Sequence, residues 1–386
     1  MKHFRFGWWL SLLFGAFLLN DSARAAQPKE MFVYFGTYTR AAKDRVASKG
    51  IHVSKLDLKT GKLTEPEVAA EAGNPAFLAI HPNKRFLYAV GEMGQGGGVM
   101  AFAIKDDGKL ALLNERPSGG AGPTHLTVDR AGQNVLVANY GGGSIACLPI
   151  GADGKLAPVS SFIQHKGSSV NAKRQAAPHA HGIYTDSANR FVFVPDLGMD
   201  KVMIYRLDSD AGKLAPNDPA FATVKPGSGP RHFAFEPKGR FGYVINEMVC
   251  TMTAFSYSAT SGALTEIQTI STLPDGVEVQ AGYSTAEVFT HPTGKFLYGS
   301  NRGHDTIVVY AINAKDGTLK LVEHEPTQTK IPRGFGVDPT GRYLIAGGQN
   351  SDNATVFRID QKTGALEPTG QSVAVGSPVC VEFLGR

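Results

Sequence analysis

Short apolar runs rich in β-branched and aromatic residues, separated by turn residues, dominate the pattern along this chain. The stretch GPRHFAFEPKGRFGYVINE, residues 229–247, is typical, because two apolar runs flank the polar segment Glu-Pro-Lys-Gly-Arg. Runs of this kind predict β-strands, and Pro and Gly suit the tight turn between them. No long helical periodicity follows the first 26 residues. The pattern therefore predicts an all-β protein built from hairpins.

This hairpin is one of six similar copies at spacings of about 50 residues. A second marker, a turn of the form x-Gly-x-Leu, recurs seven times, at Gly61, Gly108, Gly154, Gly212, Gly262, Gly317 and Gly364. Each unit holds four short apolar runs; in the unit after Gly229 they read HFAFE, FGYVIN, TAFSY and ALTEIQTI. Four antiparallel strands in a repeat of this length predict a β-propeller.

The two ends of the chain decide the predicted number of blades. Residues 376–383 match only the first strand of a unit, whereas MFVYFGTY, residues 31–38, matches the second strand. We therefore predict a seven-bladed β-propeller with four antiparallel strands per blade, in which the N- and C-terminal strands share one blade. Closure of this kind leaves no open sheet edge. Residues 27–386 are predicted to form this single domain.

The N-terminus has the pattern of a cleaved signal peptide. Lys2 and Arg5 precede an apolar run at residues 6–19, and Ala-Arg-Ala follows at 23–25 as a cleavage site. This run is shorter than the roughly 20 apolar residues that span a bilayer. We therefore predict that residues 1–26 are removed, that the mature chain has no membrane span, and that it is periplasmic or secreted. An uncleaved anchor is the alternative.

Charge and cysteine content exclude several classes of protein. The formal net charge is only +5 and no basic run occurs, which argues against a nucleic-acid partner. Cys147, Cys250 and Cys380 are far apart and odd in number, so we expect buried thiols rather than a disulfide framework or a metal site. His179 and His181 could share a metal ion, but no third ligand has a suitable spacing. No cofactor and no metal are predicted.

Strand direction predicts where the chemically reactive residues meet. In an antiparallel blade, the first strand begins and the second ends on the same face, beside the central channel. These positions differ between the copies, while the strands and turns stay alike. The His, Arg and Glu residues at these strand ends, with the neighbouring His179 added, are His125, His179, His181, Arg231, His232, Glu247, Glu287, Arg302 and Arg333. Scattered residues that converge on one concave face are typical of a ligand site.

The chemistry of this set favours an anionic ligand and hydrolysis. Guanidinium groups bind carboxylates and phosphates through two hydrogen bonds. A Glu beside a His and an Arg can supply a general base and stabilise an oxyanion. No G-x-S-x-G nucleophile motif is present. Taken singly, a strand-end arginine is usually a solvated rim residue, and Glu247 and Arg231 could simply form a structural ion pair.

With these motifs in view, the chain resembles the seven-bladed β-propeller lactonases of the 6-phosphogluconolactonase type, a family that also includes carboxymuconate cyclases. The resemblance covers essentially all of residues 31–386. It is carried by FVYFGTYT, PHAHG, GPRHFAFEPKGRFGYVINE, SNRGHDTI and IPRGFGVDPTGRYLIAGGQNSD.

The resemblance implies an enzyme that hydrolyses a sugar lactone, a small and anionic substrate. It implies a site formed by His179 or His181, Arg231, Glu247 and Arg302, and the register of the repeats favours His181. We expect Glu247 to act as the base, with the arginines holding the substrate. His179, His125, His232, Glu287 and Arg333 are the expected substrate-binding residues. The predicted export separates the chain from cytosolic phosphosugars, so the phosphate on the substrate stays an open question.

Two alternatives remain open at this point. The same residues could run the reaction in the ring-forming direction, as a lactone-forming cyclase or isomerase of the muconate type. The chain could also be a non-catalytic exported binding module, because propellers host many functions and the fold alone does not decide between them.

Overall fold

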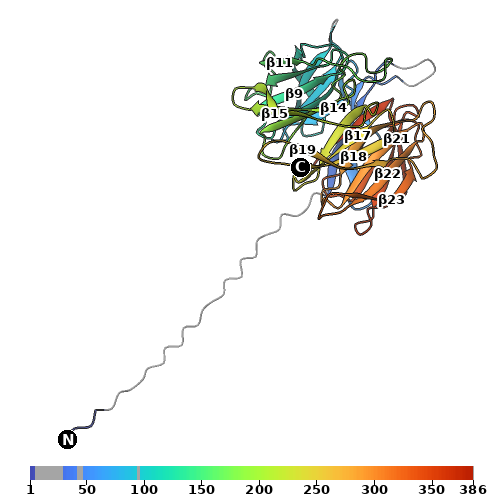
Figure 1. Ribbon diagram of the computed structural model, residues 1–386. Coiled ribbons are helices and arrows are strands. Elements are labelled where there is room, and N and C mark those ends of the chain that lie inside the picture. The colour runs from blue at the N-terminus through green and yellow to red at the C-terminus, as the bar shows by residue number, and fades with distance from the viewer. Residues whose placement is uncertain (5–28, 41–46, 94–95, 386) are drawn as a thin grey trace.

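The computed structural model describes residues 1–4, 29–40, 47–93 and 96–385. Most of the predicted signal peptide, from residue 5 onward, lies outside the described residues. The described part consists of strands, turns and loops, and Figure 1 shows them gathered into one ring-shaped body. No helix among these residues has the length and apolar character needed to cross a bilayer.

The strands form seven antiparallel sheets of four strands, which confirms the predicted seven-bladed propeller. Blade 1 contains β28 (Pro378–Leu384), β1 (Glu30–Thr37), β2 (Gly50–Asp57) and β3 (Glu67–Glu71). Blade 2 contains β4 (Leu78–Ile80), β5 (Phe86–Gly91), β6 (Gly98–Ile104) and β7 (Leu110–Pro117). Blade 3 contains β8 (Pro123–Val128), β9 (Asn134–Asn139), β10 (Ser144–Pro149) and β11 (Ser161–Gln164).

The remaining four blades follow in chain order. Blade 4 contains β12 (Tyr184–Thr185), β13 (Phe191–Asp196), β14 (Lys201–Asp208) and β15 (Lys213–Thr223). Blade 5 contains β16 (Pro230–Phe235), β17 (Phe241–Asn246), β18 (Thr251–Tyr257) and β19 (Leu264–Ser271). Blade 6 contains β20 (Ser284–Thr290), β21 (Phe296–Arg302), β22 (Thr306–Ile312) and β23 (Leu319–Pro326). Blade 7 contains β24 (Pro332–Val337), β25 (Tyr343–Gly348), β26 (Asn353–Ile359) and β27 (Leu366–Ala374).

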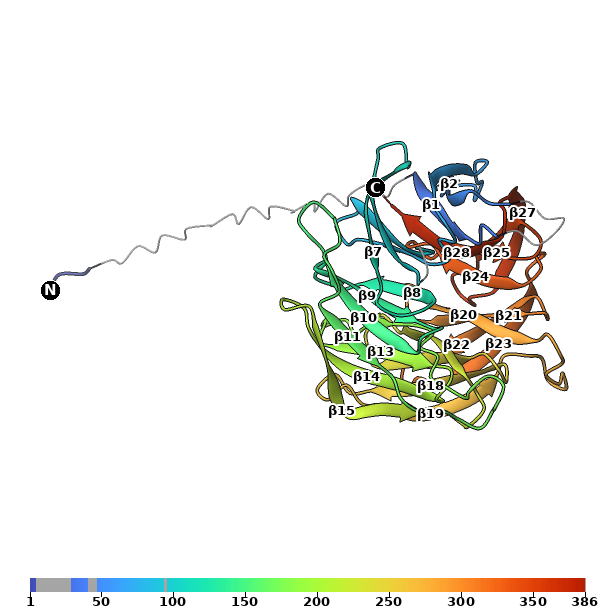
Figure 2. The same ribbon diagram turned by 90° about the horizontal axis from the view of Figure 1, so that it is seen from above.

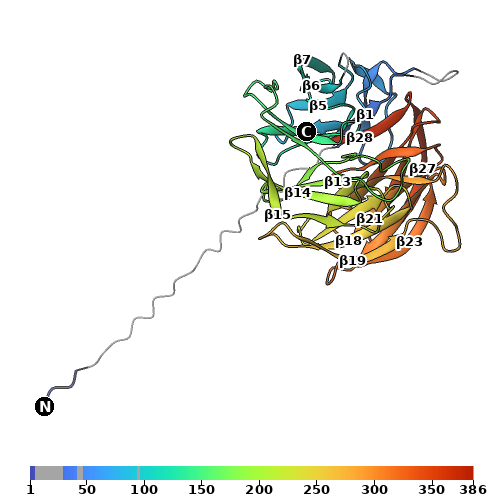
Figure 3. The ribbon, with the colours of Figure 1, turned by 45° about the horizontal axis from the view of Figure 1, so that its top comes forward.

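Blade 1 closes the ring as predicted, because β28 pairs with β1 along Phe32–Thr37. Figure 3 shows β1 and β28 side by side. The first strands of neighbouring blades contact one another around the centre, from β16 through β20, β24, β28 and β4 to β8. In Figure 2 these strands lie inside the ring, whereas outer strands such as β15, β19, β23 and β27 lie at its periphery. The starts of the inner strands therefore surround the central channel.

The two sequence repeats meet at several of the blade interfaces. In blade 2 the Tyr88 hydroxyl donates a hydrogen bond of 3.0 Å to the carbonyl of Gly154, in the outer hairpin turn of blade 3. A Cβ on Gly154 would collide with the ring of Phe86, and the positive φ of 81° also requires glycine. The same tyrosine–glycine bond joins Tyr34 to Gly108, Tyr243 to Gly317 and Tyr298 to Gly364. The recurring F-x-Y and x-Gly-x-Leu patterns are therefore parts of one interblade contact.

Hydrophobic clusters fill the space between adjacent blades. The cluster between blades 5 and 6, for example, contains Phe241, Ile245, Leu297 and Tyr310. The three cysteines are free and buried, as predicted. Because the sheets pack through such layers, the scaffold can hold different side chains at the channel mouth without changing its core.

A pair of glycine variants tests the interblade contact. Gly317 and Gly370 have φ values of 77° and 75°, but a Cβ would collide with Phe241 only at Gly317. Substitution by Ala should cost about 1–2 kcal/mol of unfolding free energy at either site through the left-handed backbone. Gly317→Ala should lose a further 1–3 kcal/mol, roughly, through overpacking. Equal losses in urea unfolding would show that the packing against Phe241 contributes nothing.

Candidate active site

The ends of the hairpin at residues 229–247 meet at the channel mouth. Glu247 directly follows β17, and its backbone N–H donates to the carbonyl of Gly229, just before β16, at 2.7 Å. Arg231 Nε then donates to Glu247 Oε2 at 3.1 Å. Both side chains are almost completely buried, with exposed fractions of 3% for Arg231 and 7% for Glu247. The two residues sixteen positions apart are therefore direct neighbours.

β-Bulges at the starts of the inner strands place the side chains of this mouth. The β16–β17 register skips from the pair Pro230–Asn246 to the pair His232–Ile245, so Arg231 is an extra residue without a cross-strand partner. Thr124 in β8 and Arg333 in β24 are extra residues at equivalent bulges. A bulge bends its strand and redirects one side chain. The propeller thus turns strand residues toward the channel axis at the same point of several blades.

Glu247 is the common acceptor for three arginines. Besides Arg231, Arg302 Nη2 lies 3.0 Å from Glu247 Oε2, and Arg174 Nη2 donates to Oε1 at 2.7 Å. Burial alone would raise the pKa of Glu247, but the positive charges of Arg302, Arg231 and Arg174 lower it to about 2. The carboxylate is therefore ionised at any physiological pH and is a weak proton acceptor.

His181 lies beside this carboxylate. Its backbone N–H donates to the carbonyl of Pro195 in β13 at 2.9 Å, which fixes the residue in the loop before β12. The ring Nε2 is 3.9 Å from Glu247 Oε2, and the buried Nδ1 has no hydrogen-bond partner among the described residues. Burial, and then the charge of Arg231, lowers the pKa of His181 well below its usual value. The imidazole is therefore neutral at neutral pH and can accept a proton.

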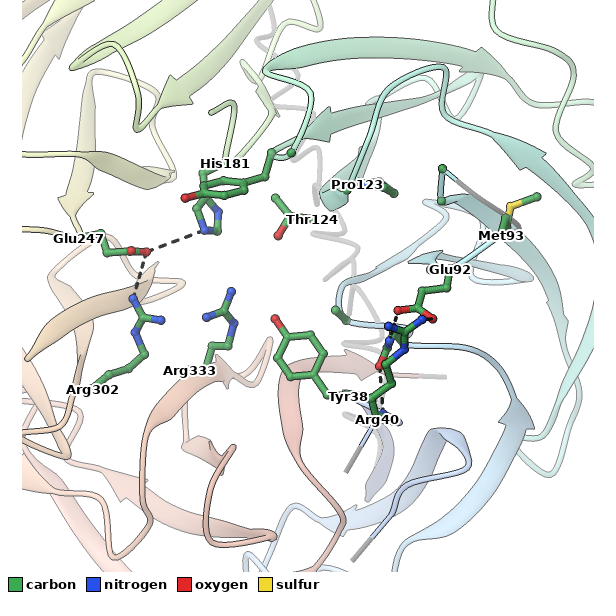
Figure 4. Close-up of a pocket in the computed structure, with 18 of the residues that line it drawn as sticks. Tyr38, Arg40, Glu92, Met93, Pro123, Thr124, His181, Glu247, Arg302 and Arg333 are labelled. Carbon is green, nitrogen blue, oxygen red and sulfur yellow. Dashed lines mark hydrogen bonds and ion pairs between the residues drawn. The ribbon is translucent and has the colours of Figure 1, made fainter. Parts of the chain in front are cut away.

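Glu247 and His181 border a cavity of about 680 Å³. Figure 4 shows His181, Arg302, Arg333 and Tyr38 pointing into it from different blades. Arg333 lies over the Tyr38 ring at 5.6 Å. The buried Nε of Arg302 has no partner among the described residues. The guanidinium groups of Arg302 and Arg333 at this end of the cavity can bind an anion or an oxyanion.

The opposite wall of the cavity contains a second cluster of polar side chains, which is more exposed to solvent. Arg40 Nη2 lies 2.7 Å from Glu92 Oε2, and the Asn74 amide also donates to Glu92. Thr124, Tyr140 and Gly97 complete this side of the cavity. The cavity therefore combines an arginine-rich end with a wall of hydrogen-bonding groups that suit a polyhydroxylated ligand. In the part of the chain that the structure describes, no group of three or more His, Cys, Asp or Glu residues is arranged to hold a metal ion.

Comparison with known proteins agrees with this architecture. The profile of the family described as "Lactonase, 7-bladed beta-propeller" matches residues 32–383. The chain belongs to this family. It is 37% identical to a 6-phosphogluconolactonase of Bacillus subtilis over 91% of this chain and 97% of the relative, and 34% identical to one of Formosa agariphila over 79% and 86%.

A solved structure of a lactonase is also similar to this lactonase-family chain over most of its length. The periplasmic gluconolactonase of Pseudomonas aeruginosa superposes with a TM-score of 0.85 at 32% identity, covering 92% of this chain and 99% of that chain. The resemblance drawn from the motifs is thereby confirmed at the level of the family and the fold.

The predicted site residues of this lactonase-family chain divide into four groups. His181, Glu247, Arg302 and Arg333 line the cavity. Arg231 contacts Glu247 from behind and is not among the described residues that line the cavity. His125, His232 and Glu287 lie deeper along the channel, where the His125 and His232 ring centroids are 5.1 Å apart. His179 stacks on Tyr140 at 4.6 Å and donates a hydrogen bond from Nδ1 to the Tyr140 carbonyl, outside the cavity lining.

Sequence reasoning missed Arg174, which contacts Glu247, and Arg40 and Asn74, which line the cavity. Arg174 lies in the loop between β11 and β12, and Asn74 lies just before the inner strand of blade 2. Alignment of the repeats finds only positions that occur in every copy, so it cannot find a loop residue such as Arg174.

Glu247→Gln tests whether the buried carboxylate is needed to hold the arginines. Its removal should lower the free energy of unfolding by about 3–5 kcal/mol, because it leaves buried positive charge unpaired. Glu92→Gln, which breaks an exposed ion pair, is the matched control and should cost about 0–1 kcal/mol.

The difference in unfolding free energy between wild type and Glu247→Gln should fall at acidic pH. The pKa of Glu247 is about 2 in the folded protein and 4.5 ordinarily. The stability difference between wild type and Glu247→Gln should therefore be complete above pH 4.5 and shrink as the pH falls toward 2. A difference that stayed constant over this range in urea unfolding would contradict the charge assignment.

Proposed function

We propose that this chain hydrolyses a sugar lactone at the cavity beside Glu247 and His181. The observation that carries the proposal is a neutral histidine and a buried, ionised carboxylate next to arginine donors in one cavity. Membership of the lactonase family supports it, as do the names of the relatives: 6-phosphogluconolactonases and a periplasmic gluconolactonase. Lactone hydrolysis needs a base for water and positive donors for the oxyanion, and it needs no covalent nucleophile.

In the proposed mechanism His181 is the general base. Its neutral imidazole takes a proton from water while the water oxygen attacks the lactone carbonyl. The ring C–O bond then breaks, and the imidazolium returns the proton to the departing ring oxygen, which becomes a hydroxyl group. Arg302 and Arg333 stabilise the oxyanion and then the product carboxylate. The net reaction adds one water to the lactone and gives a hydroxy acid.

Glu247 has a different role in this proposal from the base expected from the sequence. A carboxylate with a pKa of about 2 is a poor base, because its proton affinity is far below that required near neutral pH. Glu247 instead holds Arg302 beside the reacting carbonyl and faces His181 across 3.9 Å, where it stabilises the imidazolium that forms. Arg231 holds Glu247 from the buried side.

The proposed substrate is a polyhydroxylated lactone with or without a phosphate. The guanidinium of Arg333 contacts the Tyr38 ring in the cavity, and no ion pair to a carboxylate is present for it among the described residues. Arg333 is therefore the side chain best placed for an anionic group. We also propose that the chain is exported after cleavage of residues 1–26, in line with the periplasmic relative; mass analysis of the mature N-terminus tests this.

Hydrolysis of glucono-δ-lactone and of its 6-phosphate, corrected for the spontaneous reaction, tests the proposed activity. Wild-type protein should accelerate at least one of them, and His181→Gln should lose about 10²–10⁴-fold in kcat through loss of the base. His324→Gln, a change of the same type in the outer strand β23, is the control and should retain wild-type rates. No acceleration of any lactone would exclude hydrolysis. Ring closure of a muconate under the same conditions would favour the cyclase alternative, and binding without turnover would favour the binding module.

The pH dependence of kcat/KM tests the identity of the base. Because the pKa of His181 lies well below 6.5, the active neutral form persists as the pH falls through 6.5. The acid limb of the corrected kcat/KM profile should therefore lie below pH 6.5. A limb at or above that value would indicate an unperturbed or raised histidine and contradict the assignment.

A further inference from the structure

A chain of hydrogen bonds continues from Glu247 into the interior of the channel. Arg231, which donates to Glu247, also donates through Nη1 to the carbonyl of Ala286 at 2.8 Å and to His232 Nε2 at 3.2 Å. The other ring nitrogen of His232, Nδ1, is 2.7 Å from Glu287 Oε1. The exposed fractions of the His232 and Glu287 side chains are 2% and 6%. The chain thus runs from Glu287 through His232 and Arg231 to Glu247.

The donors and acceptors fix the protonation of this chain. A guanidinium group only donates, so His232 Nε2 must accept from Arg231 and Nδ1 must carry the ring proton. Glu287 Oε1 then accepts from His232 Nδ1 and from the backbone N–H of Val288 at 3.1 Å. Burial and the charge of Arg231 lower the pKa of His232, and burial raises the pKa of Glu287 to about 8. Both groups are therefore neutral near pH 7.

Two bulges in adjacent blades create the contact. The bulge at Arg231 places His232 against the channel axis, and the β20–β21 register shifts between Thr285 and Val288, around Glu287. The residues at the corresponding position of the other aligned copies are Phe77, His125, Gly182 and Gly334. A propeller blade therefore does not need a buried carboxyl group or a histidine–carboxyl pair at this position. The His232–Glu287 pair requires an explanation other than the formation of the blade.

We propose that His232 and Glu287 are positioning residues that hold Arg231, and through it the Glu247 carboxylate, in the geometry used for lactone hydrolysis. Without the Glu287 acceptor, the His232 ring can turn or move its proton to Nε2. An N–H at Nε2 would then face the Arg231 guanidinium, two donors would oppose each other, and Arg231 would shift away from Glu247 Oε2. The catalytic effect rests on the proposed function, whereas the hydrogen-bond chain does not.

Paired substitutions of Glu287 test this proposal. Glu287→Gln keeps a neutral acceptor for His232 Nδ1 and should retain kcat within about threefold, whereas Glu287→Leu should lower kcat by about 10–100-fold with KM within about twofold, as for other supporting residues. The matched control is Glu382→Leu. Glu287 and Glu382 both line a second, lower cavity of the channel. Burial also raises the pKa of Glu382 to about 8, but Glu382 is not hydrogen-bonded to His232. This control should retain wild-type kcat.

The outcomes distinguish positioning from other roles. Equal losses of kcat in Glu287→Leu and Glu382→Leu would show a general effect of disturbing the lower cavity and would overturn the proposal. Loss in Glu287→Gln as large as in Glu287→Leu, with melting temperatures unchanged, would assign Glu287 a proton-transfer role and would also overturn it.

A measurement on the unmodified protein keeps the proposal testable if Glu287→Leu fails to fold or if no lactone is hydrolysed. In ¹⁵N-histidine-labelled wild type at pH 7, the resonance removed by His232→Gln should show a protonated, hydrogen-bonded Nδ1 and an unprotonated Nε2. Glu287→Gln should preserve this tautomer. A protonated Nε2 or an imidazolium in wild type would contradict the hydrogen-bond chain itself, independently of the activity.

Discussion

The ionised carboxylate of Glu247, buried at the inner end of a cavity, is the interaction on which the site depends. A charge in this position is costly unless several partners compensate it. Arg231, Arg302 and Arg174 do so from three parts of the chain, and their charges lower the pKa of the carboxyl group to about 2. The same arrangement fixes Arg302 at the cavity and places His181 opposite a permanent negative charge. In the proposed mechanism this one buried charge holds the arginine donors and faces the imidazolium that forms at His181.

The propeller separates what holds the ring together from what lines the channel. The tyrosine–glycine bonds and the apolar layers lie between blades, away from the mouth. Bulges at the starts of the inner strands then turn single residues toward the axis, and these residues differ from blade to blade. Because a bulge changes only the local strand path, the site residues can vary without loss of the interblade contacts.

Much of this arrangement could be predicted from the sequence, for physical reasons. The fold followed from the repeated hairpins and x-Gly-x-Leu turns, and the structure shows that glycines of these turns accept interblade hydrogen bonds from tyrosines of second strands. The meeting of Arg231 and Glu247 followed from strand direction in a hairpin. The repeats and the strand direction could not predict depth along the channel. Arg231, His232 and Glu287 occupy mouth positions by alignment, but they are not among the described residues that line the cavity.

The pKa of Glu247 and the position of Arg174 could also not be predicted from the sequence pattern. A Glu beside a His indicated a base, but the number of arginines around Glu247 depends on the fold, and that number makes the carboxylate a poor proton acceptor. Arg174 contributes one of these charges from the loop between β11 and β12, outside the strands and turns that the repeats share.

The most direct test of the account is a crystal structure of the protein with an aldonic acid product, gluconate or its 6-phosphate, bound. We predict the product carboxylate at Arg302 and Arg333, within reach of His181, with Glu247 still paired to Arg231. A product bound elsewhere, or one whose carboxylate replaces Glu247 as the partner of Arg231, would contradict it.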